Sequence, residues 1–197
     1  MRVVVLTLLV LFTGRLAAPA EAVAQYHRLT DAIVVGGTLA AAGSGAEVLT
    51  GGPELGGLIE IPISDTLRLR GEAALGDWHF NGYPHAGIAG SSMRRYRLTA
   101  SVLHSRNPPS PRRRLAGYGG GGAGVYLYRF PSRPNGGAWG LHGVAGVEYL
   151  LPTMRSRWLA GGEVQLHVMG QPRAPGDVTW IPMAAAHVSA VLKYRLP

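Results

Sequence analysis

The stretch Gly57–Leu75 reads GLIEIPISDTLRLRGEAAL, and Gly146–Leu166, about 90 residues further on, repeats its pattern as GVEYLLPTMRSRWLAGGEVQL. Each copy has an alternating strand with a Glu, a short turn, and an Arg-bearing strand that reaches Gly-Glu. The repeat aligns Glu60 with Glu148 and Glu72 with Glu163. A repeat of about 90 residues is too long for one unit of a solenoid. It fits two four-strand halves of one closed sheet, so it predicts a β-barrel.

Period-two alternation of apolar and polar residues extends over the rest of the chain. It predicts eight strands, at about 31–42, 53–64, 67–80, 94–106, 115–130, 137–151, 158–170 and 183–196. Ser64-Asp65-Thr66 is a tight turn, 107–114 and 152–157 are compact and basic, and 43–52, 81–93, 131–136 and 171–182 are mostly longer and rich in Gly and Pro. An even strand number with short turns at one end and longer loops at the other is typical of outer-membrane barrels. Each predicted strand is long enough for a tilted crossing of about 9–11 residues.

Each predicted strand has one apolar and one polar face. In strand 158–170, for example, Val164 and Leu166 alternate with Glu163, Gln165 and His167. A membrane barrel directs its apolar face to lipid and its polar face to the lumen, whereas a soluble barrel does the reverse. The apolar faces are rich in Ala, Gly and Val, and the polar faces carry charges of both signs. These features favour the membrane barrel, and a secreted, soluble, lipocalin-like binding barrel is an alternative.

An eight-stranded barrel is just wide enough to be filled by its own side chains. We therefore expect the charged residues of the polar faces to pair across a narrow lumen without a wide channel: Glu60, Arg68, Arg70, Glu72, Arg95, Arg97, Glu148, Glu163, Lys193 and Arg195. Four aromatic residues near strand ends are expected to form the girdle at the membrane interfaces: Trp139, Tyr149, Trp158 and Tyr194.

The first 24 residues have the three parts of a secretory signal. Arg2 is the positive region, Val3–Phe12 the apolar region, and Ala22-Val23-Ala24 the small-residue cleavage box, with a cut after Ala22 as the other option. The mature domain is then 25–197. The chain has no cysteine, which excludes disulfides and thiolate sites. Its formal net charge of +8 could suggest nucleic-acid binding, but an exported chain so rich in Gly argues against it.

These residues resemble the small eight-stranded bacterial outer-membrane β-barrel proteins, the OmpA-type and OmpX-type barrels. The resemblance rests on the repeated strand–turn–strand pattern, on Tyr118–Tyr128 (YGGGGAGVYLY), and on a last strand that ends in Tyr-Arg-Leu. It implies an all-β, eight-stranded antiparallel up-and-down transmembrane barrel with a structural or surface-interaction role. It also implies a monomer in the bacterial outer membrane that uses no cofactor. Its partners would be outer-membrane lipids, lipopolysaccharide and the barrel-insertion machinery, with no nucleic acid.

Three motifs in the chain contain residues that could carry chemistry. The run Gly119–Gly122 lacks the Lys-Ser/Thr of a phosphate-binding loop, so it is interpreted as strand glycine. The histidines show no metal-binding spacing, so no metal site is predicted, although His142, His167 and His187 would approach one another if their strands are neighbours. His187 and Ser189 share a strand face with the spacing found in outer-membrane lipid A deacylases. Ala190 replaces the Asn that usually follows that Ser, and the pair is expected to face inward. A deacylase-like hydrolase is therefore the alternative function rather than the main one.

Overall fold

The structure is a computed structural model, which describes residues 30–43, 48–50, 52–80, 92–129, 135–152, 157–170 and 182–195. The predicted signal peptide, 1–24, lies outside the described residues. Within these ranges no helix is long and apolar enough to cross a bilayer.

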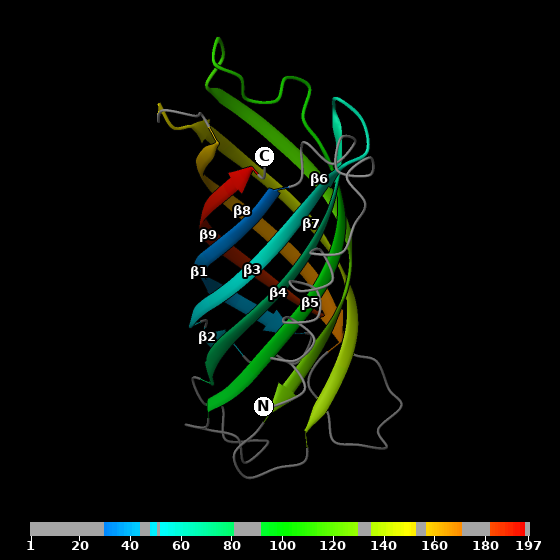
Figure 1. Cartoon of the computed structure of the whole chain (residues 1–197). Coiled ribbons are helices and arrows are strands. Elements are labelled where there is room, and N and C mark those ends of the chain that lie inside the picture. Colours follow the sequence, from blue (N-terminus) through cyan, green and yellow to red (C-terminus); the bar gives the residue numbers. More distant parts are fainter. Residues whose placement is uncertain are drawn as a thin grey trace, which may run out of the picture.

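The described residues form one antiparallel sheet that closes on itself (Figure 1). Its strands are β1 (Thr30–Gly43), β2 (Val48–Thr50), β3 (Pro53–Pro62), β4 (Leu67–Phe80), β5 (Ser92–His104), β6 (Leu115–Arg129), β7 (Gly136–Leu150), β8 (Trp158–Gly170) and β9 (Pro182–Arg195). Consecutive strands from β3 to β9 pair with each other, and β1 pairs with both β3 and β9. The predicted up-and-down barrel is therefore confirmed.

The short strand β2 was not predicted, because residues 43–52 were interpreted as a loop. It pairs with the end of β1 and with the end of β4, which are also the two neighbours of β3. β2 and β3 therefore share one place in the wall, between β1 and β4. Counted in this way, the nine described strands occupy eight places around the barrel. A run of three residues is too short to show the alternation by which the other strands were recognised.

The barrel has two different ends. At one end residues 63–66 connect β3 to β4, residues 105–114 connect β5 to β6, β1 begins and β9 ends; we call it the turn end, and it is uppermost in Figure 1. The Oγ atom of Ser64 accepts hydrogen bonds from the backbone N–H groups of Thr66 and Leu67, at 3.3 and 3.1 Å, which fixes the tight β3–β4 turn. The opposite end is the loop end.

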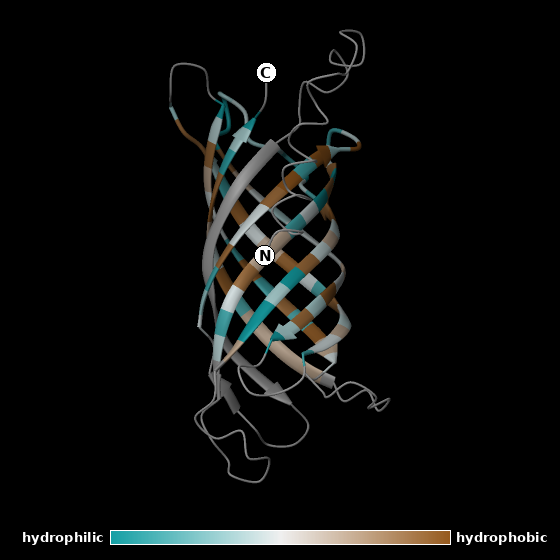
Figure 2. Cartoon of the chain, turned by 60° about the horizontal axis from the view of Figure 1, so that its bottom comes forward, coloured by the Kyte–Doolittle hydropathy of each residue, from teal (hydrophilic) through white to brown (hydrophobic). Residues whose placement is uncertain are grey.

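In this barrel many hydrophobic side chains lie on the outer surface and many charged side chains lie inside, the reverse of a soluble protein. Leu98 and Leu166 on the outer surface are 64% and 61% exposed, whereas Arg95 and Glu163 inside are 0% and 3% exposed. Along the strands, hydrophobic and hydrophilic residues alternate (Figure 2). This alternation gives the barrel the outward apolar face of a transmembrane barrel.

The interior near the loop end is filled by an apolar and aromatic cluster. Its members come from five strands and are almost completely buried: Trp78, Met93, Tyr126, Tyr128, Met169, Met183 and Ala185. Cross-strand partners build it, because Trp78 lies opposite Met93 and Met169 lies opposite Met183. The charged residues of the interior lie between this cluster and the turn end.

Candidate functional site: the barrel interior

The charged interior residues nearest the turn end form one connected group, which we call the turn-side cluster. It consists of three carboxylates and three cations from five strands: Glu60, Glu148, Glu163, Arg68, Arg70 and Lys193. All of them are buried except Arg68, whose side chain is 16% exposed.

Two cations bridge the carboxylates that the sequence repeat aligns. Lys193 Nζ donates to Glu60 Oε1 at 2.7 Å and to Glu148 Oε2 at 3.0 Å. Arg68 Nη1 donates to Glu60 Oε2 at 2.8 Å and to Glu148 Oε2 at 3.2 Å. The repeat therefore has a structural meaning, because its equivalent acids meet inside the barrel and share the same partners.

Arg70 carries the network across the lumen. Its Nη1 donates to Glu163 Oε2 at 2.8 Å, while its Nε and Nη2 donate to Glu60 Oε1 at 3.0 and 2.7 Å. Tyr118 also donates to Glu163 Oε2, at 2.6 Å. A Cβ at Gly146 would lie 2.6 Å from the Tyr118 hydroxyl, so only glycine leaves room for this tyrosine. Since β4 and β8 lie on opposite sides of the ring, the Arg70–Glu163 bond spans the interior.

A second group, the loop-side cluster, consists of Glu54, Glu72, Arg95 and Arg97. Arg97 Nη2 donates to Glu54 Oε1 and to Glu72 Oε1, both at 2.5 Å, and Arg95 pairs with Glu54. Gln165 joins the two clusters, because its Nε2 donates to Glu72 Oε2 at 3.1 Å and to Glu163 Oε1 at 2.7 Å.

Each of the two clusters, as described, contains as many carboxylates as cations. Burial of a lone charge costs several kcal/mol, and pairing with good hydrogen bonds offsets that cost. The balance explains how so many ionised groups are held inside a narrow barrel.

Three histidines lie side by side next to the loop-side cluster, as their strand positions predicted. The ring centroids of His142 and His167 are 5.2 Å apart, and those of His167 and His187 are 4.6 Å apart. Their ring nitrogens contact Ser101, Tyr126 and Arg95, among other groups. The described residues contain no group of three or more His, Cys, Asp or Glu side chains arranged to hold a metal ion.

His187 and Ser189 contact different interior residues. His187 Nε2 lies 3.1 Å from Arg95 Nη1, and Ser189 Oγ donates to Glu163 Oε1 at 3.4 Å. His187 is buried in the interior, so it does not face the outer surface where lipid would lie. The geometry gives no support to a lipid-cleaving role for this pair.

Arg195, one of the predicted interior residues, lies outside both clusters, and several interior residues were not predicted. Arg195 lies at the turn end, where its Nη1 and Nη2 donate to the Pro109 carbonyl oxygen at 3.3 Å. The prediction omitted Glu54, although Glu54 has the same strand parity as Glu60. It also omitted Tyr118, Gln165 and the other uncharged partners, because it considered charges alone.

The predicted girdle residues lie on the outer surface at two levels. Trp139 is 61% exposed and lies near the loop end of β7. Tyr149, Trp158 and Tyr194 lie near the turn end, where the rings of Trp158 and Tyr194 are 4.9 Å apart. Aromatic side chains near both ends of the outer face are what interfacial belts require, and their role as a girdle stays a prediction.

No protein-family model and no curated protein matches the chain. Solved structures do match. Neisserial surface protein A superposes with a TM-score of 0.61 at 15% identity, over 85% of this chain and 96% of that one. The outer membrane protein OprG of Pseudomonas aeruginosa gives a TM-score of 0.53 at 13% identity, over 87% and 99% of the two chains.

Ail, the attachment invasion locus protein of Yersinia pestis, solved with the heparin analogue sucrose octasulfate, gives a TM-score of 0.50 at 13% identity, over 85% and 99%. In all three comparisons the match covers nearly the whole of the other barrel. The chain therefore has the fold of the small eight-stranded outer-membrane β-barrel proteins, the class of the OmpA-type and OmpX-type barrels.

Proposed function

We propose that this chain is an integral protein of the bacterial outer membrane, with a structural or surface-interaction role and a closed lumen. The apolar outer face carries the membrane location, and the Arg70–Glu163 bond, which joins opposite walls of the barrel, carries the closed lumen. A wide aqueous channel would need this space. The apolar and aromatic cluster near the loop end supports the same conclusion, because it fills a second layer of the interior.

The apolar outer surface supports lipids and lipopolysaccharide as the immediate partners, with insertion by the barrel-insertion machinery. For the surface role, the segments between strands at the loop end would carry the contacts. The fold is shared with Ail, the attachment invasion locus protein of Yersinia pestis. This likeness supports a surface-interaction role and does not extend to a particular ligand.

Two measurements on the refolded chain test the proposal. First, an unheated sample should migrate differently from a boiled one on a detergent gel, since folded membrane barrels resist detergent. Second, planar bilayers containing the heat-modifiable protein should show no sustained porin-sized conductance steps. The double variant Arg70→Ala with Glu163→Ala removes the crossing bond, and because the loop-end cluster still fills the interior, we expect it to show no porin-sized steps either. Large, stable steps from the unmodified protein would contradict a closed lumen.

A further inference from the structure

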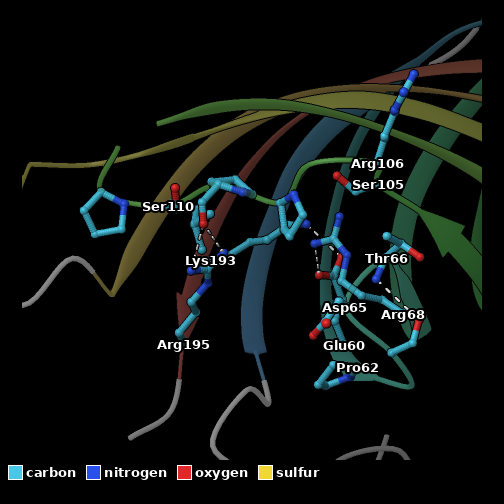
Figure 3. A pocket seen from close by; sticks show the side chains of 15 residues that line it. Glu60, Pro62, Asp65, Thr66, Arg68, Ser105, Arg106, Ser110, Lys193 and Arg195 are labelled. Atoms are coloured by element: carbon cyan, nitrogen blue, oxygen red, sulfur yellow. Dashed lines mark hydrogen bonds and ion pairs between the residues drawn. The ribbon is translucent and has the colours of Figure 1, made fainter. Parts of the chain in front are cut away.

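A cavity of about 480 Å³ opens at the turn end, above the turn-side cluster (Figure 3). Its floor includes Glu60, Arg68 and Lys193, which reach it from β3, β4 and β9. Its walls include the β3–β4 turn and residues 105–111 of the β5–β6 connection. The cavity therefore combines buried charges with a rim close to the membrane surface expected for such a barrel.

The lining of the cavity carries more positive than negative charge. Its described cations are Arg68, Arg106, Lys193 and Arg195, and its carboxylates are Glu60 and Asp65. Four cations against two carboxylates leave a formal surplus of two positive charges. Glu148, Glu163 and Arg70 lie just outside the lining and belong to the balanced turn-side cluster, so with them included the surplus is one positive charge, from Arg106 and Arg195 against Asp65.

Arg68 has donors that its ion pairs do not use. Its Nη1 serves Glu60 and Glu148, whereas its buried Nε and Nη2 have no hydrogen-bond partner among the described residues. A buried donor without a partner is costly, and both atoms are closed off from the cavity, so an acceptor gains them when the Arg68 side chain turns toward it. A planar guanidinium presents such donors as a fork that suits oxyanions.

The wall formed by the β5–β6 connection is held in place. Ser105 Oγ donates to the Gly117 carbonyl oxygen at 2.9 Å, and Arg195 holds the Pro109 carbonyl oxygen. The backbones of Ser110 and Arg113 bond to each other in both directions, at 2.8 and 3.0 Å. The three prolines of the segment restrict its backbone further. A cavity fixed in this way loses little entropy when a ligand enters.

We propose that the turn-end cavity binds a phosphate group, held by Arg68, Arg106 and Arg195. A phosphate group presents three strong acceptor oxygens and so can serve three arginines at once, whereas a carboxylate presents two. Because the cavity opens at the rim, the phosphate can belong to a lipid headgroup or to a free phosphate compound. The inference rests on the barrel fold and goes beyond the proposed structural role.

The test uses the full mature chain refolded in a nonionic detergent. Calorimetry would measure the binding of inorganic phosphate in one arm and of micelles doped with phosphatidic acid in the other. Arg106→Gln is the main variant, because Arg106 is exposed and its loss should not disturb folding. Arg195→Gln is the second variant. Arg129→Gln is the matched control, since Arg129 is an exposed arginine at the loop end.

We expect Arg106→Gln and Arg195→Gln to weaken binding about tenfold each, the effect of losing one charged hydrogen bond, and Arg129→Gln to leave it unchanged. Binding of inorganic phosphate would identify a free phosphate compound as a source, and binding of doped micelles alone would identify a lipid headgroup. No binding in either arm, or an equal loss in the Arg129→Gln control, would overturn the proposal. Gel mobility that no longer shifts on heating would instead count against the membrane barrel itself.

Discussion

Glu163 has the densest set of contacts among the interior carboxylates. It accepts hydrogen bonds from Arg70, Tyr118, Gln165 and Ser189, and its side chain is fully buried. These donors come from four strands, so one carboxylate connects widely separated parts of the wall. Removing a single partner from such a network leaves an uncompensated buried charge, which costs more than the bond itself contributes.

We therefore predict that Glu163→Ala lowers the free energy of unfolding by about 3–5 kcal/mol, because Arg70 loses a buried partner. Urea titration in phospholipid vesicles would measure it. The matched control is Asp77→Ala, which breaks the Asp77–Arg94 pair on the outer surface, where the two side chains are 47% and 53% exposed. The control should be nearly neutral because the pair lies near the loop end of β4 and β5, where a cation close to the membrane interface costs about 0–1 kcal/mol. Equal effects of the two substitutions would show that Glu163 is solvated.

At this scale the sequence predicted which face each charged residue takes, but not its partner. Glu60 and Glu148 were aligned by the repeat, and the structure places them on the same two cations. Which cations these are depends on strand register and on the reach of side chains across the lumen. Alternation within one strand specifies neither the register between strands nor the reach of the side chains. For the same reason the approach of Glu54 to Arg95 and Arg97 was not predicted.

At the scale of elements, the pairing of β1 with β9 closes the barrel. Its register joins Thr30 to Arg195 and Ile33 to Leu192, and it shifts between Thr38 and Ala40. The eight long strands were predicted to within two residues because their alternation extends over ten or more positions. The closing register could not be predicted, because it joins the first and last strands of the barrel.

An engineered disulfide tests the closing register, since the chain has no cysteine of its own. We predict that the double variant Ile33→Cys with Leu192→Cys forms a disulfide on mild oxidation of the folded protein, because the two positions are direct partners. Val35→Cys with Leu192→Cys is the control, since diagonal positions are about 7–8 Å apart, beyond the usual reach of a disulfide. Mobility on a non-reducing gel shows whether the disulfide has formed. Cross-linking of the control pair alone would mean that the register is shifted.

At the scale of the whole molecule, the barrel is apolar outside and charge-balanced inside. The sequence predicted this inversion, because its polar faces carry both signs of charge and its apolar faces are rich in Ala, Gly and Val with few Phe. It did not predict the turn-end cavity, which depends on how residues 105–111 pack against the end of β9. Turns and connections have no periodicity from which their packing could be derived.

The central claim is that the outer face meets lipid, and Val164 tests it most directly. Val164 lies in the middle of β8 and is 46% exposed on that face. In phospholipid vesicles, Val164→Arg should lower the free energy of unfolding by about 2–4 kcal/mol, the cost of a cation near the midplane of a bilayer. Ala160→Arg, on the same face nearer the turn end, should cost about 0–1 kcal/mol. A barrel that meets water on this face would tolerate both substitutions equally, and an unchanged free energy of unfolding for Val164→Arg would contradict the membrane assignment.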